Sequence, residues 1–230
     1  DDPRLKVYFE TCTDKAYAGE YRGIRQGTCF AHNHYAGLSK LSVDQSTDAP
    51  LMSSAEVWFL RAEAALRGFS NETPKTCYET GIKTSFAQWG VGDATNYLAS
   101  DKKPSDYKEM VPASGGKDMK ALITISPKWN DTAGKEGQLE QIITQKWLAC
   151  WPESYEAWSE QRRTGYPKLF KVQTNNSGGT IDTNDMIRRL PFSTDDADKD
   201  PVQYDLLKKA LGGPDHGGTR LWWDAGKNNF

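Results

Sequence analysis

The sequence has few of the residues that build metal and redox centres. It contains four cysteines and three histidines among 230 residues, and no two cysteines have the C-x-x-C spacing of a zinc site. No apolar run approaches the roughly 20 residues that a membrane-spanning helix needs. The opening DDPRLKVYFE lacks the pattern of a signal peptide. We therefore expect no bound metal, no cofactor and no transmembrane segment.

An excess of charge is also missing. The 29 basic and 31 acidic residues give a net charge of −2, and the pI is about 6.0. The basic pairs Arg162–Arg163 and Arg188–Arg189 are too short to form a nucleic-acid-binding surface. We therefore expect no nucleic-acid partner, and we expect these arginines and Arg220 to pair with carboxylates such as Glu156 or Asp224.

The chain has no start methionine and opens directly into ordered-looking sequence. We therefore expect a fragment or a processed product of a longer protein. Its length allows one hydrophobic core or slightly more. Cys77 and Cys150 fall on predicted apolar helix faces and should behave as small hydrophobic residues. A Cys12–Cys29 disulfide would form only outside the cytoplasm, and the sequence leaves it open.

Aromatic residues, by contrast, are dense in one stretch. Residues 139–166, LEQIITQKWLACWPESYEAWSEQRRTGY, hold Trp147, Trp151 and Trp158, and TRLWWD follows at 219–224. So much aromatic surface must be buried or used to hold a flat ligand. The helical spacing favours burial, and we expect Trp151, which lies in the turn, to be the most exposed of the three.

The apolar spacing in this stretch predicts a helical hairpin. Leu139 to Cys150 supply one stripe of a first helix, and Pro152 interrupts it. Ser154 is placed to cap a second helix, and Gly165 is placed to end it. The facing sides of the two helices would be lined with tryptophan.

A second helical hairpin is predicted over residues 51–92. Ser53 and Glu56 form a capping box, Gly68 is placed to end the first helix, and Pro74 is placed to begin the next. Small residues lie near the expected helix contact: Ala62, Ala64, Ala65 and Gly81. Closely packed pairs of this kind are typical of tetratricopeptide repeats, which need neighbours to cover their faces.

These patterns divide the chain into four segments. A loop-rich lead-in (1–50) precedes the hairpin at 51–92, a long connection (93–137) follows, and residues 138–230 hold the aromatic hairpin and the C-terminal region. A connection of that length is usually functional or poorly ordered. The acidic stretch STDDADKDP (193–201) is predicted to be a solvated loop in which Asp200 caps the next helix, because it lacks the glycine and the final glutamate of a calcium loop.

The chain resembles the C-terminal half of the SusD/RagB family, surface lipoproteins through which Bacteroidetes capture nutrients. The segment with the most specific match is LEQIITQKWLACWPESYEAWSEQRRTGYPKLF, residues 139–170. Three shorter matches follow the family's order: AEVWFLRAEAALRGF (55–69), IRRLPF (187–192) and TRLWWD (219–224).

This resemblance implies an all-α protein of tetratricopeptide-like helical hairpins with a loop-rich C-terminal region. It also implies a non-catalytic protein that binds an oligosaccharide, or in some lineages a peptide. Such proteins work with a SusC-type TonB-dependent transporter at the outer membrane. The lipidated cysteine and the family's N-terminal half are absent from this chain, so we expect that half to be a partner in ligand binding.

Glycan binding needs exposed aromatic faces and a few orienting polar groups. Family members differ in their binding residues, so the candidates come from the loops of this chain. Those before residue 50 are Tyr21, Arg22, His32, His34 and Tyr35. Tyr107 and Trp129 in the long connection are second choices. All seven can also be read as ordinary surface or half-buried loop residues, and no motif supplies the carboxylates that an H-x-H metal site would need.

Two other functions stay open. A glycoside hydrolase would fit the aromatic content, but it needs two carboxylates at a defined separation in a cleft. Glu153, Glu156 and Glu160 lie on the aromatic hairpin, where we expect structural roles. A peptide-binding helical-repeat scaffold of the same family is the other alternative.

Overall fold

The computed structural model describes residues 2–28, 32–111, 113, 115–224, 226 and 228–230. In these residues the secondary structure is helical and no β-strand is present; two isolated bridges pair Phe9 with Leu41 and Tyr107 with Met119. The all-α prediction is therefore confirmed. The helices are α1 (Leu5–Tyr8), η1 (His32–Tyr35, a 3-10 helix), α2 (Ser54–Arg67), α3 (Pro74–Gln88), α4 (Thr95–Leu98), α5 (Gly134–Ala149), α6 (Ser154–Thr164), α7 (Thr194–Lys199) and α8 (Pro201–Leu211).

The chain forms two compact units. The helical unit comprises residues 1–25, 29–170 and 230, and the C-terminal unit comprises residues 26–28 and 171–229. Helices α1 to α6 belong to the helical unit, whereas α7 and α8 belong to the C-terminal unit.

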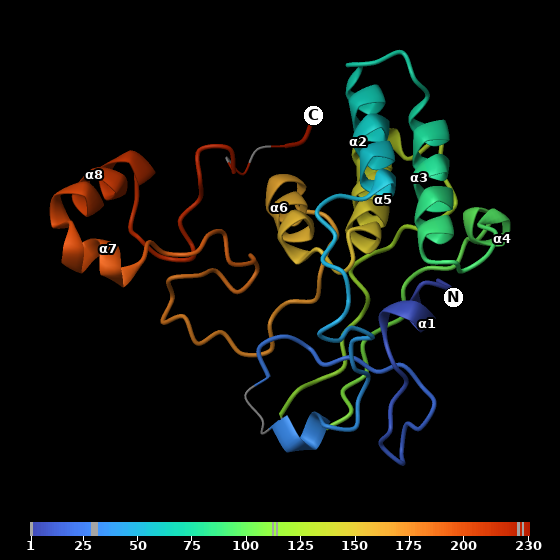
Figure 1. The fold of residues 1–230 in the computed structure, drawn as a ribbon, viewed down its shortest axis with the longest axis horizontal. Helices are drawn as coiled ribbons and strands as arrows, with labels where there is room; N and C mark the ends of the chain where they lie inside the picture. Colours follow the sequence, from blue (N-terminus) through green and yellow to red (C-terminus); the bar gives the residue numbers. More distant parts are fainter. Residues whose placement is uncertain (1, 29–31, 112, 114, 225, 227) are drawn as a thin grey trace. The chain divides into compact units, whose positions relative to one another are not determined.

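The core of the helical unit lies among α2, α3 and α5, which pack side by side (Figure 1). Phe59 from α2, Ile82 from α3 and Ile142 from α5 are fully buried there. Gly81 permits the close approach of α2 and α3, because a Cβ at this position would come within 2.8 Å of the Phe59 ring. The predicted role of a small residue at this contact is thus confirmed for Gly81.

Most predicted helix ends are confirmed. The Ser53 hydroxyl accepts a hydrogen bond from the Glu56 amide at 3.1 Å, and Gly68, Gly165 and Gly212 end their helices in the left-handed conformation, as a C-terminal glycine does. The other bond of the expected capping box, from the Ser53 amide to the Glu56 carboxylate, is not found among the described residues. The Glu56 carboxylate instead lies 3.8 Å from the ammonium of Lys146.

Two helix starts differ from the prediction. The residue that caps α6 is Glu153 rather than Ser154: its carboxylate accepts hydrogen bonds from the amides of Tyr155 (2.9 Å) and Glu156 (2.7 Å). A carboxylate at this position accepts hydrogen bonds from free backbone N–H groups and is attracted to the positive end of the helix dipole. Helix α5 begins at Gly134, earlier than Leu139, because its polar first turn carries no apolar stripe from which periodicity could be read.

One part of the long connection, residues 126–128, is held against the core. The buried amide of Gln141 donates to the carbonyls of Ser126 (3.0 Å) and Lys128 (2.7 Å). From α3, the Tyr78 hydroxyl donates to the Pro127 carbonyl at 2.7 Å. These three bonds fix the segment around residues 126–128 against the helices.

The C-terminal unit is held by arginine–carboxylate pairs. Arg188 donates two hydrogen bonds of 2.6 Å to buried Asp224, and Arg189 pairs with Asp215. The Asp200 carboxylate accepts from the Gln203 amide at 3.0 Å, which confirms the predicted cap of α8. The preceding acidic stretch is not a loop as predicted, because residues 194–199 form helix α7.

Candidate functional site

The three tryptophans of the aromatic hairpin serve packing in this structure. Trp151 lies 5.4 Å from Tyr8 in a stacked geometry and 5.1 Å from Phe9. The Arg162 guanidinium covers the Trp158 ring at 3.7 Å. Trp147, Trp151 and Trp158 are all half-buried, so Trp151 is not a freely exposed ring, and whether it is the most exposed of the three stays a prediction. Its contacts with the N-terminal segment, which the local spacing does not encode, cover part of the ring.

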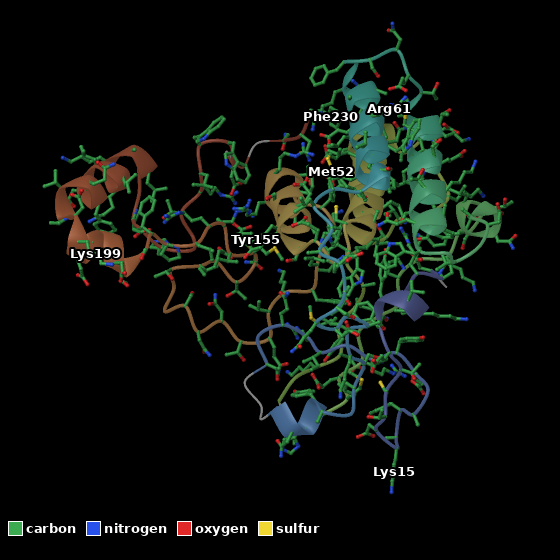
Figure 2. All side chains as sticks on the ribbon, in the orientation of Figure 1. Lys15, Met52, Arg61, Tyr155, Lys199 and Phe230 are labelled. Carbon is green, nitrogen blue, oxygen red and sulfur yellow. The ribbon has the colours of Figure 1, made fainter. Side chains whose placement is uncertain are left out.

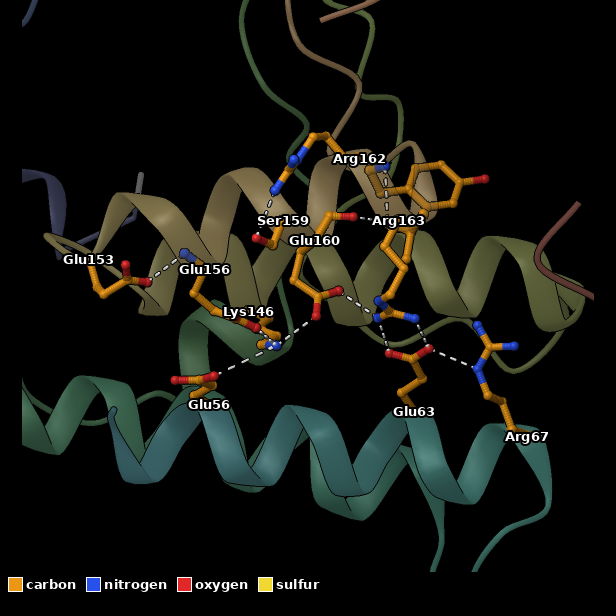
Figure 3. A network of polar contacts seen from close by, with 12 residues as sticks. Glu56, Glu63, Arg67, Lys146, Glu153, Glu156, Ser159, Glu160, Arg162 and Arg163 are labelled. Atoms are coloured by element: carbon orange, nitrogen blue, oxygen red, sulfur yellow. Dashed lines mark hydrogen bonds and ion pairs between the residues drawn. The ribbon is translucent and has the colours of Figure 1, made fainter. Parts of the chain in front are cut away.

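A network of ion pairs joins this hairpin to α2 (Figure 3). The ammonium of Lys146 is fully buried and lies 2.6 Å from Glu156, 2.8 Å from Glu160 and 3.8 Å from Glu56. Burial lowers the pKa of Lys146, but Glu160 and Glu156 outweigh it and hold the pKa above its ordinary value. Burial raises the pKa of Glu56, because a desolvated carboxylate prefers its neutral form.

The same network continues along α6. Arg163 donates to both oxygens of Glu63 at 2.7 and 2.6 Å and to Glu160 at 2.5 Å. Arg67 also donates to Glu63, at 2.8 Å. Burial would raise the pKa of Glu63, yet Arg163 and Arg67 hold it below its ordinary value. The expected arginine–carboxylate pairing is therefore present for Arg163, which binds Glu63 and Glu160, whereas the cation that Glu156 binds is Lys146 and not an arginine.

Two of the predicted binding residues lie on adjacent loop positions. Tyr21 and Arg22 are half-buried, and the Arg22 guanidinium pairs with Glu20 and lies 5.5 Å from the Tyr17 ring. Polar side chains beside aromatic rings are what a sugar ligand requires. Tyr21 and Arg22 therefore stay candidate binding residues.

The remaining loop candidates lie in or near η1. His34 is exposed, whereas Tyr35 is 6% exposed and packs with Cys12 and Leu38. The side chain of His32 lies outside the described part of the structure, as does Cys29. Cys12 is a buried free thiol, so the structure gives no support to the Cys12–Cys29 disulfide that the sequence left open.

Tyr107 and Trp129, the two candidates from the long connection, differ in exposure. Tyr107 is half-buried, and its hydroxyl donates to Glu109 at 3.2 Å. Burial, the charge of Glu109 and the nearby Tyr35 phenol raise the pKa of Tyr107 to about 12. Trp129 is 8% exposed, and its ring packs 5.1 Å from Tyr78. A buried ring offers no face to a sugar, and Trp129 is buried because segment 126–128 is fixed to the core.

Four exposed aromatic residues of the described part were not among the candidates: Phe69, Tyr155, Trp222 and Phe230. Trp222 is 92% exposed on the C-terminal unit, close in sequence to Asp224, which Arg188 and Arg220 both bind. Tyr155 is 72% exposed on α6 (Figure 2). No sequence signal separates Trp222 from its half-buried neighbour Trp223, since both belong to the same short motif.

A pocket of about 610 Å³ was also not foreseen. It lies in the helical unit among the end of α3, helix α4, segment 123–127 and one face of α5. Phe86, Val91, Ile123, Ile125 and Leu148 supply most of its apolar wall. Its volume falls in the range of small-molecule sites.

The floor of this pocket is a paired polar network. The Asp2 carboxylate accepts from the Arg4 guanidinium at 2.7 Å and from the Tyr97 hydroxyl at 2.9 Å. Gln145 accepts from Arg4 at 2.8 Å and donates to the Tyr97 hydroxyl at 2.8 Å. Burial would raise the pKa of Asp2, but the bonds from Arg4 hold it below its ordinary value. The charges of the floor therefore balance.

Neither metal sites nor membrane spans are found in the described residues. No group of three or more histidine, cysteine, aspartate or glutamate side chains there could hold a metal ion. Among the same residues, no helix combines the length and the apolar character that crossing a bilayer requires.

The closely packed helices α2, α3, α5 and α6 are those of a tetratricopeptide-like helical protein. The family model described as "SusD-like: Susd and RagB outer membrane lipoprotein" matches residues 1–224, and the chain belongs to this family. A comparison with curated proteins found no match.

Solved structures of SusD homologues are similar over the whole chain. A homologue from Bacteroides vulgatus is 58% identical, with a TM-score of 0.93 over 100% of this chain and 47% of its own. A chitin-binding homologue from Flavobacterium johnsoniae is 41% identical, with a TM-score of 0.91 over 100% of this chain and 48% of its own. A homologue from Bacteroides thetaiotaomicron is 36% identical, with a TM-score of 0.89 over 97% of this chain and 49% of its own. The chain thus spans about half the length of these relatives.

Proposed function

We propose that the protein is a non-catalytic nutrient-binding protein that captures a glycan at the cell surface. It would sit at the outer membrane and work with a SusC-type TonB-dependent transporter in polysaccharide uptake. The observation that carries this proposal is membership of the SusD-like family, joined to 41% identity with a chitin-binding homologue over the full chain. The family's description as outer membrane lipoproteins supports the location.

The ligand surface that we propose is formed by loops of the helical unit, those before residue 50 and the part of the long connection around Tyr107. Tyr21, Arg22 and His34 have half-buried or exposed side chains, and Tyr107 and His32 are further candidates. Tyr35 and Trp129 are buried, and we leave them out as stacking faces. The part of the protein that corresponds to the other half of its relatives would complete the binding surface.

The hydrogen bonds and ion pairs of the acidic residues in the aromatic hairpin support a non-catalytic role. A glycoside hydrolase needs one carboxylic acid and one carboxylate facing a cleft. In the aromatic hairpin Glu153 caps α6, while Glu156 and Glu160 bind the buried ammonium of Lys146. These side chains are committed to holding helices together.

The test is glycan binding by the protein at its natural full length, measured by tryptophan fluorescence and calorimetry against a panel of polysaccharides. Tyr21→Ala and Arg22→Ala should weaken binding by about tenfold, because stacking area and an orienting cation are lost. Tyr155→Ala is the matched control, since it removes an exposed tyrosine from α6. We expect this control to bind like the unchanged protein.

The same samples are examined for sugar cleavage and for peptide binding. Turnover that a single carboxylate substitution abolishes would overturn the proposal in favour of a hydrolase. Binding of peptides with no response to any glycan would overturn it in favour of a peptide-binding member of the family.

A further inference from the structure

The pocket among α3, α4 and α5 has apolar walls that are fixed to the core. Phe86 and Ile125 belong to these walls. Residues 126–127 form one edge, and their backbone carbonyls accept hydrogen bonds from the Gln141 amide and the Tyr78 hydroxyl. The cavity therefore keeps its shape whether or not it is filled.

The polar groups at the floor of the pocket favour an apolar occupant. The Asp2 carboxylate already accepts hydrogen bonds from Arg4 and Tyr97, and Gln145 is bonded to both of these residues. The Thr144 hydroxyl makes no hydrogen bond but is enclosed by protein atoms. A polar ligand would therefore lose its bonds to water without gaining new ones at this floor, whereas an apolar group has none to lose.

The N-terminal end of the chain lies at this pocket. Asp2 and Pro3 are among its lining residues, and the bonds of the Asp2 carboxylate hold that end in place. The chain covers 47%, 48% and 49% of the lengths of the three homologues described above, and it resembles the C-terminal half of the family. Helical hairpins of this class bury their faces against neighbouring hairpins.

We propose that the pocket is an internal docking site, filled by apolar side chains of the segment that precedes residue 1 in the full-length protein. That segment is tethered at the edge of the pocket, so its effective concentration there is high. Its side chains lie against Phe86, Ile125 and Leu148. The pocket is then closed to soluble sugars, and the docking does not depend on the proposed glycan-binding function.

Photo-crosslinking in the full-length protein tests this docking. The photoreactive residue p-benzoylphenylalanine replaces Asn96, which is exposed on α4 and lines the pocket. Irradiation should join position 96 to a peptide from the ten or so residues before residue 1, since about ten extended residues span roughly 33 Å. Mass spectrometry of the digest identifies the joined peptides. The control places the same photoreactive residue at Thr76, an exposed position of α3 that does not line the pocket, and should give no such link.

Thiol labelling gives a second measurement on the same two positions. Asn96→Cys and Thr76→Cys each introduce a thiol at a position that is exposed in residues 1–230. If the preceding segment covers the pocket, a maleimide should label Asn96→Cys at least about tenfold more slowly than Thr76→Cys in the full-length protein. Peptide mapping separates these sites from the native cysteines, and circular dichroism verifies that both variants are folded.

Each outcome decides for or against the docking. Links from position 96 to the preceding segment, together with slow labelling, support it. Equal labelling of the two variants with no link from position 96 overturns it and leaves an open pocket. Links to a remote part of the same protein, or to a second protein, overturn it by naming another occupant. Failure of glycan binding in the tests above would leave these results unchanged, so the two proposals are tested separately.

Discussion

Single residues in this protein take their roles from partners that are distant in sequence. Lys146 occupies a position in the apolar stripe of α5 and is fully buried. A charged group in that position requires carboxylates around it, and Glu56, Glu156 and Glu160 supply them from α2 and α6. The tryptophans differ for the same reason: Trp158 is covered by the Arg162 guanidinium, whereas Trp222 is 92% exposed.

Replacing Lys146 by methionine should strongly destabilise the fold. The substitution leaves the buried carboxylate of Glu56 without its cation and removes one of the two cations that pair with Glu160, which keeps Arg163. Breaking such a buried pair costs about 3 kcal/mol. Urea unfolding followed by tryptophan fluorescence measures the change in the free energy of unfolding. Lys128→Met is the control, because Lys128 forms an exposed pair with Asp101 and should contribute less than about 1 kcal/mol. Equal losses in the two variants would show that the buried network adds no stability.

At the scale of elements, the helix ends determine where the hairpins turn. Gly165 and Gly68 stop their helices at positive φ, which a residue with a side chain rarely adopts. The start of α6 depends on Glu153, whose carboxylate binds two amides. Its neighbour Ser154 is the first helical residue and is exposed.

These two neighbouring residues give a direct test of the cap. Glu153→Ala should lower the free energy of unfolding by about 1 kcal/mol, the usual contribution of an N-cap side chain. Ser154→Ala should change it by less than about 0.5 kcal/mol, as for an exposed position without a special role. The same urea titrations measure both. A larger loss from Ser154→Ala would restore serine as the cap.

At the scale of the whole molecule, buried ion pairs make stability depend on acidity. The pKa of Glu63 is held below its ordinary value of 4.5 by Arg163 and Arg67, despite the opposing effect of burial. Its stabilising contribution is therefore complete above 4.5 and is lost as the pH falls through the lower, folded-state pKa. Asp2 behaves in the same direction relative to its value of 3.8. Glu56, whose pKa is raised by burial, opposes them and offsets part of the loss.

Acid unfolding should accordingly depend on Glu63. Glu63→Gln should destabilise the protein at pH 7 and reduce the fall in the free energy of unfolding between about pH 5 and pH 3. The control is Glu10→Gln, since Glu10 is exposed and forms no ion pair among the described residues. Urea titrations across this range provide the comparison. If both variants lose stability with the same slope as the unchanged protein, Glu63 is not a source of the acid sensitivity.

Local patterns predicted most of the helical hairpins. Apolar spacing and end residues indicated α2, α3 and α6 with nearly correct limits, because amphipathic periodicity and caps act within a few residues. The polar first turn of α5 and the whole of α7 were missed. Neither presents an apolar stripe, and α7 lies in an acidic stretch whose composition suggests a loop.

The sequence predicted less of the candidate site than of the fold. Trp129 lies in a polar, glycine-containing connection, yet bonds from Gln141 and Tyr78 draw that connection onto the core and bury the ring. The pocket joins residues near positions 2, 97, 125 and 145. No local pattern links positions so far apart in the chain.

The sequence by itself determined the family, the all-α class and the hairpins, because these depend on short-range spacing and on a specific motif around Trp147, Trp151 and Trp158. Only the tertiary structure decided which aromatic rings are open, which cations meet which carboxylates, and where the pocket lies. Exposure and pairing are properties of contacts between distant segments. They depend on long-range packing, whereas the positions of the helices depend mainly on local sequence.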